Sequence, residues 1–346
     1  MSPVTQLERE IRDQARVLAS RTAPGWQSAE RAAALLRRAD VEHLVIAARG
    51  TSDNVGRYAQ YLLGSQARLL AGLAAPWLYE GGSPPRLTGA AVLAISQSGR
   101  SPDIAAVLAA ARQQGRPTLA ITNHPDSPVG ALGDVVVPLL TGEERSVAAT
   151  KTYLASLHAV AQIAVCLSAE AGHASWFDRL PGLVEAVSQE QLATRSRFDP
   201  LSAVNLLTVV ARGLQLPTAH ETALKVRELS GMPAEAFSLP DLIHGPIAAL
   251  GRGGALWLVS TTGREQPDTA VLASLQAAVG TSVVVSDDED LLAQAEIGVL
   301  IPPGLPEWLA PMLAVVPAQA AALRLGEIRG VDVDRPHGLH KVTLTR

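Results

Sequence analysis

Cysteine is almost missing from this chain, and so are long apolar runs and blocks of basic residues. The single cysteine, Cys166, cannot form an internal disulfide, and its apolar helical surroundings predict a packing role in a cytoplasmic protein. No run of about 18 apolar residues is present, which argues against a membrane span. The charged, helix-like N-terminus argues against a signal peptide. The formal net charge of −4, without a Lys/Arg block, argues against nucleic acid and acidic membranes as partners.

Composition places the chain among folded globular proteins. Hydrophobic residues make up 47% of its 346 residues and charged residues 18%, which is enough apolar material to bury a core. A chain of this length is expected to form about two domains. Its eight histidines are scattered, with no His-x-x-x-His spacing and no cysteine pair. We therefore expect no zinc site and no cofactor.

Short apolar runs alternate with helical patterns along the whole chain, which predicts βαβ units and parallel sheets. Strands are expected at 43–49, 75–79, 90–94, 118–122 and 134–140, with corresponding strand ends at 206–213, 258–264 and 283–287. Trp257 is expected to lie in an apolar strand. Helices are expected at 5–22, 27–39, 55–67, 102–114, 220–228 and 307–329, the last of them packing at a dimer interface. The acidic run 287–290 is expected to begin a helix, because carboxylates complement the helix dipole there.

The two halves of the chain repeat the same landmarks about 164 residues apart. The strand ends that correspond are Arg49-Gly50 with Arg212-Gly213, Gly99 with Gly263, and Asn123 with Asp287. We interpret the chain as a tandem duplication of a doubly wound α/β domain, joined by a helical stretch at 148–193. Arg49 and Arg212 are expected to pair with acids between the halves.

A serine-rich turn, Ile95–Ser101, lies between an expected strand and an expected helix. Such a turn directs backbone N–H groups and the positive end of a helix dipole at one place. The serine hydroxyls add donors, and Gly99 permits positive φ. The turn is therefore predicted to bind a small phosphate; the alternative is a serine-rich loop with a helix cap.

The second copy has fewer hydroxyls at the corresponding ends, Leu214-Gln215 and Ser260–Thr262, but carries an ionisable helix. Glu221, Lys225 and Glu228 fall on one helix face, as i, i+4 and i+7. A solvated, salt-bridged face is the alternative, but the same helix is largely apolar, so a polar cavity is favoured. His244 follows soon after, on a turn ended by Gly-Pro.

Together these segments resemble the sugar isomerase (SIS) domain family, a tandem of flavodoxin-like αβα domains. The resemblance is to the isomerase half of glucosamine-6-phosphate synthase and to stand-alone glucosamine-6-phosphate deaminases. It runs over about residues 25–346 in the family's order. The motifs are Arg49–Ser52, Ile95–Gly99, Val147–Lys151, Ala211–Gly213, Glu221–Glu228, Ala234–Phe237, His244–Pro246 and Asp332–Pro336 followed by Lys341.

The resemblance implies roles for individual positions. Sugar and phosphate contacts are implied for Thr51, Ser52, Ser96, Gln97, Ser98, Ser101 and Val147. Glu228 matches the base that moves a proton between C1 and C2, and His244 matches the ring-opening histidine, supplied by the partner subunit of a homodimer. Lys341 matches the tail lysine near the carbonyl, while Glu221 and Lys225 match supporting positions. Ser101, Arg100 and Ala149 stand where the family usually has threonine, glutamate and serine.

The implied domains are an N-terminal helix at 1–24, a phosphate-binding SIS domain at 25–165, a second SIS domain at 195–330 and an active-site tail at 331–346. The chain enters the isomerase part after about two dozen residues, so we expect no glutaminase domain and no built-in ammonia source. The first hypothesis is therefore an enzyme converting glucosamine 6-phosphate to fructose 6-phosphate and ammonia. The second is an isomerase or deglycase on another phosphosugar, such as fructosamine 6-phosphate. The third is a non-catalytic phosphosugar sensor.

Overall fold

The computed structural model describes residues 4–39, 41–168, 173–261 and 269–342. The chain forms two compact units, which are described separately. We call Asp13–Glu144, Lys151–Pro181 and His340–Arg346 the first unit, and Met1–Arg12, Arg145–Thr150 and Gly182–Leu339 the second unit.

A parallel five-stranded sheet forms the centre of the first unit, with the order β2-β1-β3-β4-β5. This is the flavodoxin-like order, in which the chain reverses direction across the sheet between β1 and β3. Its strands are β1 (His43–Ala47), β2 (Leu70–Leu73), β3 (Ala90–Ile95), β4 (Thr118–Thr122) and β5 (Val135–Pro138). All residues of β3 and β4 are buried, as expected for strands covered on both faces.

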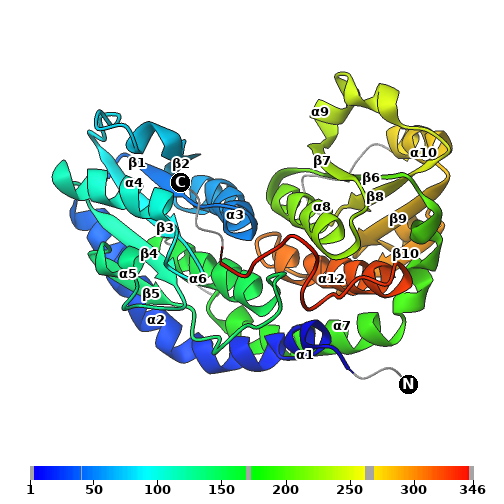
Figure 1. Ribbon diagram of the computed structural model, residues 1–346, viewed down its shortest axis with the longest axis horizontal. Helices are drawn as coiled ribbons and strands as arrows, with labels where there is room; N and C mark the ends of the chain where they lie inside the picture. Colours follow the sequence, from blue (N-terminus) through cyan, green and yellow to red (C-terminus); the bar gives the residue numbers. More distant parts are fainter. Residues whose placement is uncertain (1–3, 40, 169–172, 262–268, 343–346) are drawn as a thin grey trace. The chain divides into compact units, whose positions relative to one another are not determined.

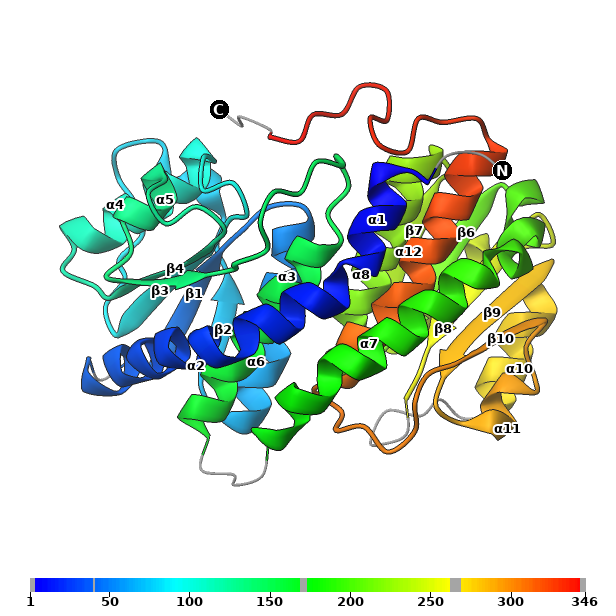
Figure 2. The ribbon, with the colours of Figure 1, turned by 90° about the horizontal axis from the view of Figure 1, so that it is seen from below.

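Helices cover both faces of this sheet (Figure 1). Figure 2 shows α4 and α5 on one face and α2 and α6 on the other. Ile104, Val107 and Leu108 of α4 belong to the same apolar cluster as Val92 and Ala94 of β3. The helices are α2 (Gln14–Arg38), α3 (Thr51–Gln66), α4 (Pro102–Gln113), α5 (Pro128–Ala131) and α6 (Lys151–Leu167).

The second unit repeats this architecture. Its parallel sheet has the order β10-β9-β8-β6-β7, which is the same strand connectivity as in the first unit. The strands are β6 (Leu206–Ala211), β7 (Ala234–Ser238), β8 (Gly254–Val259), β9 (Thr281–Ser286) and β10 (Ile297–Leu300). The predicted tandem duplication is therefore confirmed, although Thr262, Gly263 and Arg264 of the second copy lie outside the described residues.

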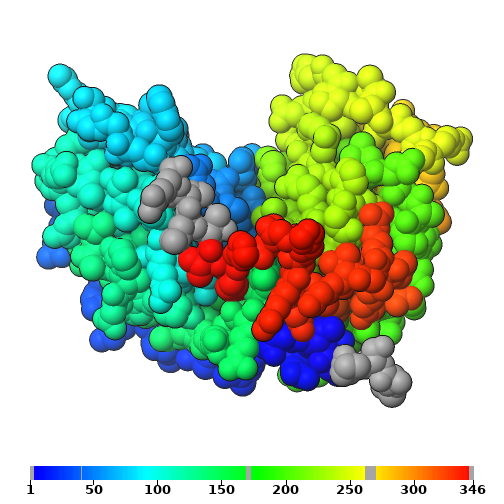
Figure 3. All heavy atoms as spheres, in the orientation of Figure 1, coloured from blue at the N-terminus to red at the C-terminus, as the bar shows by residue number. Residues whose placement is uncertain are grey.

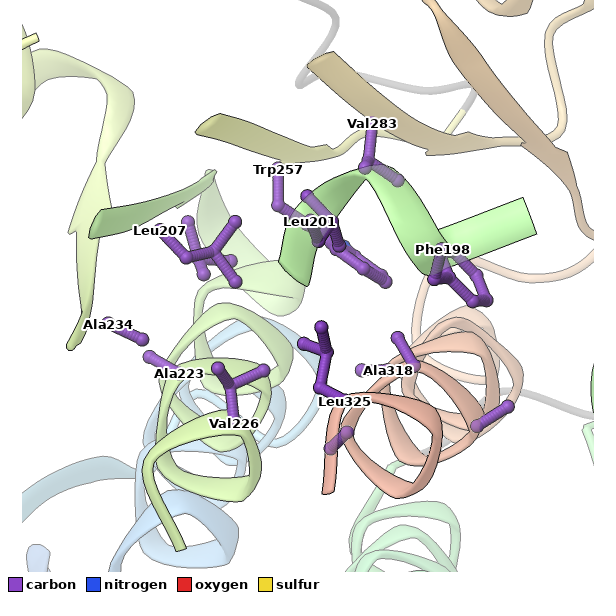
Figure 4. Packing of buried hydrophobic residues seen from close by; sticks show 14 of the residues in the cluster. Phe198, Leu201, Leu207, Ala223, Val226, Ala234, Trp257, Val283, Ala318 and Leu325 are labelled. Atoms are coloured by element: carbon purple, nitrogen blue, oxygen red, sulfur yellow. The ribbon is translucent and has the colours of Figure 1, made fainter. Parts of the chain in front are cut away.

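Two helical layers also enclose the second sheet. Figure 4 shows Leu207, Trp257 and Val283 of the sheet facing Val226 of α8 and Leu325 of α12. Figure 2 shows α10 and α11 on the opposite face. The helices are α1 (Gln6–Arg12), α8 (Leu216–Ser230), α9 (Leu239–Ile243), α10 (Thr269–Ala278), α11 (Glu289–Leu292) and α12 (Ala310–Ile328), with α7 (Ser175–Ala193) running from the first unit into the second. Short 3-10 helices are η1 (Pro76–Tyr79), η2 (Arg195–Ala203), η3 (Gly213–Gln215) and η4 (Pro246–Ala249).

The N-terminal helices do not divide where expected. The predicted break between 22 and 27 is wrong, because α2 continues through Pro24, and the real break lies at Asp13. A proline inside a helix normally costs about 3 kcal/mol. The helix tolerates it because its buried face packs against α6, so closely at Gly25 that a Cβ there would overlap the side chain of Gln162.

Three further expectations need correction. The segment 75–79 forms a 3-10 helix rather than a strand, and the edge strand β2 precedes it. Cys166 is only half-buried, near the end of α6. Helix α12 is buried almost along its whole length in the core of its own unit, so it does not offer a dimer interface. Asp288, by contrast, caps α11 as predicted, accepting from the backbone of Asp290 and Leu291.

A buried polar chain links α2 to α6 in the first unit. The Arg21 guanidinium is fully buried and donates to Nδ1 of His158 and, at 3.1 Å, to Gln162. Because Arg21 can only donate, His158 Nδ1 must accept, which leaves its Nε2 to donate to Thr22 Oγ1, 3.3 Å away. Burial, and then the neighbouring Arg21, hold the pKa of His158 well below its usual value.

His158 should therefore make the protein less stable in mild acid. The unfolded chain binds a proton at His158 below about pH 6.5 and the folded chain does not, so stability rises with pH and is lost as pH falls through that value. Between pH 7.5 and 5.5 this residue should remove about 1.4 kcal/mol from the free energy of unfolding. Urea unfolding at both pH values should show this loss, and His158→Asn should lack it. The exposed residue His337 provides the control His337→Asn, and an unchanged pH slope in His158→Asn would contradict the assignment.

Among the described residues, no helix is both long and apolar enough to cross a membrane.

Candidate active site

The hydroxyl residues predicted to bind phosphate gather at one edge of the first sheet. Strands β1 and β3 are hydrogen-bonded neighbours, with Ala47 opposite Ala94. Thr51 and Ser52 begin α3 directly after β1, while Ser96, Gln97 and Ser98 follow β3. These residues therefore lie at the point where the strand order reverses, which is the usual ligand position in open α/β sheets. We call this group and Ser101, which precedes α4, the hydroxyl edge.

Three backbone N–H groups of this edge bond within their own turns. The amides of Ser52 and Asp53 donate to the carbonyl of Arg49, at 3.0 and 3.3 Å, and the amide of Gly99 donates to Ser96, at 3.2 Å. The tight turns thus use their own amides. In contrast, Ser101 does not cap α4 with its side chain.

Gly99 is required by the shape of the serine turn. Its φ is +63°, a backbone conformation that glycine adopts without strain. A Cβ at this position would also overlap the side chain of Ser127, the residue that caps α5. The glycine therefore permits the serine turn to pack directly on the next loop.

Arg49 pairs within its own unit, so the expected pairing between the halves is wrong for this residue. Its Nε lies 2.8 Å from Oδ2 of Asp103, whose side chain is 1% exposed. The pair joins the end of β1 to the first turn of α4, and it braces the two turns that carry the hydroxyl edge.

In the second unit, α8 carries a row of three ionisable groups. Lys225 Nζ lies 3.3 Å from Glu221 Oε1 and forms a very short contact with Glu228 Oε2. Glu221 and Lys225 are each 1% exposed, whereas the Glu228 side chain is 24% exposed. Burial alone would lower the pKa of Lys225, but the two carboxylates outweigh it and raise the pKa above its usual value. The solvated-face alternative is therefore wrong, and Glu228 is the member of the row that a ligand can reach.

His244 and Val147 belong to the same unit as this row. His244 directly follows α9, whose first turn is capped by Ser238, and its side chain is exposed. Val147 is half-buried in the segment 145–150, and its amide donates to the carbonyl of Asp334 at 3.2 Å. This bond fixes the direction of the peptide group between Ser146 and Val147.

The segment around Val147 is held by the carboxylate of Glu10, which the sequence analysis did not identify, and by the backbone carbonyl of Asp334, which lies in the motif Asp332–Pro336. Glu10 of α1, 1% exposed, accepts from the amides of Arg145 and Ser146 at 2.6 and 3.2 Å. Asp334 accepts from the amides of Gln6 and Leu7 at 2.9 and 2.8 Å, and so caps α1.

Lys341 lies in the first unit, at a pocket beside the serine turn. Its Nζ is 2.6 Å from Oε2 of Glu144, whose side chain is 0% exposed. The pocket has a volume of about 450 Å³ and is lined by Gln97, Ser98, Lys341 and Glu144, among others. The tail that leads to Lys341 lies at the surface (Figure 3). The sequence analysis did not identify Glu144. The signal for it in the sequence is a glutamate that shortly precedes the helix α6.

Within the described ranges, no three His, Cys, Asp or Glu side chains come together in a way that could hold a metal ion.

The model of the SIS domain family matches residues 36–166 and 201–325. The chain therefore belongs to the SIS domain family, which confirms the resemblance. Over 320 residues it is 32% identical to glutamine–fructose-6-phosphate aminotransferase (isomerizing) from Gloeobacter violaceus, covering 88% of this chain and 52% of that protein. The chain thus spans about half the length of the curated relatives that it matches.

Solved structures show the same fold. Tagatose-6-phosphate ketose/aldose isomerase from Escherichia coli superposes with a TM-score of 0.83 at 19% identity, covering 95% of this chain and 94% of that one. Glucosamine-6-phosphate deaminase from Thermotoga maritima superposes with a TM-score of 0.77 at 18% identity, covering 99% and 100%. At these identities the two structures support the α/β fold and its duplication.

Proposed function

We propose that this chain is a phosphosugar isomerase of the SIS type that acts on glucosamine 6-phosphate, releasing fructose 6-phosphate and ammonia. The observation that carries the proposal is the row on α8. In this row Lys225, which is buried together with Glu221, contacts Glu228, and Glu228 remains accessible to solvent. A carboxylate held in place and reachable by solvent suits proton transfer between neighbouring carbons. The relationship to an isomerizing aminotransferase that acts at fructose 6-phosphate supports this substrate class.

The proposed reaction uses groups of both units. His244 of the partner subunit of a homodimer opens the sugar ring, and its exposure at the end of α9 suits a group that is supplied to another chain. Glu228 then takes the proton from C2 and returns it to C1, which turns the amino aldose into a 2-imine. Water hydrolyses this imine, and its oxygen becomes the ketone oxygen of fructose 6-phosphate as ammonia leaves. Lys341 stabilises negative charge that develops on the carbonyl oxygen.

In this proposal the hydroxyl edge holds the phosphate through Thr51, Ser52, Ser96, Gln97, Ser98 and Ser101, and Val147 contacts the sugar. Binding energy from the phosphate, which does not react, fixes the open-chain pose. The assembly of these groups around one sugar is the central claim. It requires the hydroxyl edge and the row on α8 to reach the same six-carbon ligand.

A second candidate substrate is another phosphosugar, such as fructosamine 6-phosphate. Ala149 favours it, because the resemblance implies a serine at this position and the alanine removes a hydroxyl from the segment that carries Val147. Loss of a hydrogen-bonding group from a pocket can change the ratio of kcat/KM between two competing sugars by large factors.

The test is incubation of the purified protein with glucosamine 6-phosphate, with ammonia and fructose 6-phosphate measured together. Equal amounts of both products are expected. Turnover of fructosamine 6-phosphate or tagatose 6-phosphate without ammonia release from glucosamine 6-phosphate would favour the second candidate. If no phosphosugar reacts but several raise the melting temperature, the protein is a sensor and both enzymatic proposals fail.

A further inference from the structure

Glu144 is a fully buried carboxylate at the beginning of α6, a helix of 17 residues. Its Oε1 accepts from the amide of Thr152 at 3.1 Å, and its Oε2 accepts from the Thr152 hydroxyl at 2.6 Å. The N-terminus of a long helix stabilises a negative charge through its N–H groups and its dipole. The first turn of α6 therefore fixes the direction of this carboxylate and stabilises a negative charge on it.

The cation that faces this carboxylate comes from the C-terminal tail. Lys341 Nζ approaches Glu144 Oε2 to 2.6 Å. Lys151 is nearer in sequence, but it pairs instead with Asp13, at 3.1 Å. The remaining ionisable groups of the pocket are Arg100, His124 and Glu143, all of them exposed. A contact to a buried, helix-bound carboxylate resists solvent screening better than a pair at the surface does.

The tail before Lys341 lies at the surface. Residues 337–340 are all exposed, with Leu339 at 39% exposure. The pair with Glu144 is thus the contact that determines where the Lys341 ammonium lies. That place is the wall of the pocket that Gln97 and Ser98 of the hydroxyl edge also line.

We propose that Glu144 is a positioning residue that seats Lys341, and with it the end of the tail, beside the serine turn. The proposal rests on the proposed function in one respect, since it gives the seated lysine its task at the sugar carbonyl. The seating itself depends on the pair of Glu144 and Lys341, and it can be measured without turnover.

The first measurement is hydrogen exchange of the peptide that contains Lys341 in the unliganded, full-length protein. Glu144→Gln should speed exchange in this peptide at least several-fold, and Lys341→Met should do the same. Glu30→Gln removes one negative charge from an exposed position of α2 in the same unit and should leave the tail unchanged. Unaltered tail exchange in Glu144→Gln would overturn the proposal, whatever the activity.

The second measurement separates seating from simple helix capping. Glu144→Gln should lower kcat by about 10- to 100-fold, because a misplaced catalytic group loses effective molarity, with KM for the sugar phosphate nearly constant. Combining it with Lys341→Met should lower kcat no further than Lys341→Met alone, since Glu144 acts through that lysine. Thr152→Val is expected to lower the melting temperature while the tail stays seated. Additive losses of kcat in the double variant would show that Glu144 acts on the fold instead.

If the unmodified protein turns over no phosphosugar, the proposed function fails, while the exchange experiment still decides the seating.

Discussion

Replacement of Glu228 by glutamine is expected to lower kcat by about 10²- to 10⁴-fold, the usual contribution of a positioned general base. Glutamine keeps the shape and a hydrogen-bond acceptor for Lys225 but cannot take a proton from carbon. Lys225 retains Glu221 as a carboxylate partner, 3.3 Å away, so the fold should tolerate the change. The measurement is the rate of fructose 6-phosphate formation from glucosamine 6-phosphate.

Binding should survive this substitution. In the proposed binding mode the hydroxyl edge holds the phosphate, so the sugar phosphate should raise the melting temperature of Glu228→Gln and of the unmodified protein by similar amounts. Glu235→Gln, at an exposed position of β7, is the matched control and should keep full activity. In heavy water, deuterium should enter C1 of the product only where Glu228 is intact. Full activity in Glu228→Gln would show that another group moves the proton.

The fold was predictable because its signals are local and repeated. Apolar runs such as 118–122 become strands within one or two residues of the expected bounds, and three corresponding strand ends reveal the duplication without any knowledge of contacts. Predictions failed where tertiary packing outweighs local preference. Pro24 does not end α2, because contact with α6 over Gly25 favours the continuous helix. The segment 307–329 is apolar enough for a dimer interface, but its helix α12 lies in the core of its own unit.

The residue types of the candidate site could be predicted, but the residues that hold its segments in place could not. The position of Ser96, Gln97 and Ser98 between a strand and a helix was correctly predicted, and so was the shared helix face of Glu221, Lys225 and Glu228. Phosphate binding by the serine turn stays a prediction. Glu10, Glu144 and Asp334 act on amides or a lysine more than 130 residues away in sequence. No spacing rule connects such residues, so only the three-dimensional structure reveals them.

Lys225→Met should cause the largest loss of stability. The substitution keeps the apolar stem but deprives two carboxylates of their ammonium, and one of them, Glu221, is 1% exposed. Removing one partner of a buried ion pair typically costs about 3–5 kcal/mol. Urea unfolding at pH 7.5 should show a decrease of this size relative to the unmodified protein.

The cause of that loss can be tested by pH and by a second substitution. In Lys225→Met, burial should raise the pKa of Glu221 above its unfolded value near 4.3. The folded state then binds more protons than the unfolded one, so the deficit of the variant should shrink as pH falls toward 5. Glu221→Gln combined with Lys225→Met removes both buried charges and should recover most of the stability, because only the partly exposed Glu228 then remains charged. A double variant no more stable than Lys225→Met would mean that lost packing, and not the buried charge of Glu221, accounts for the effect.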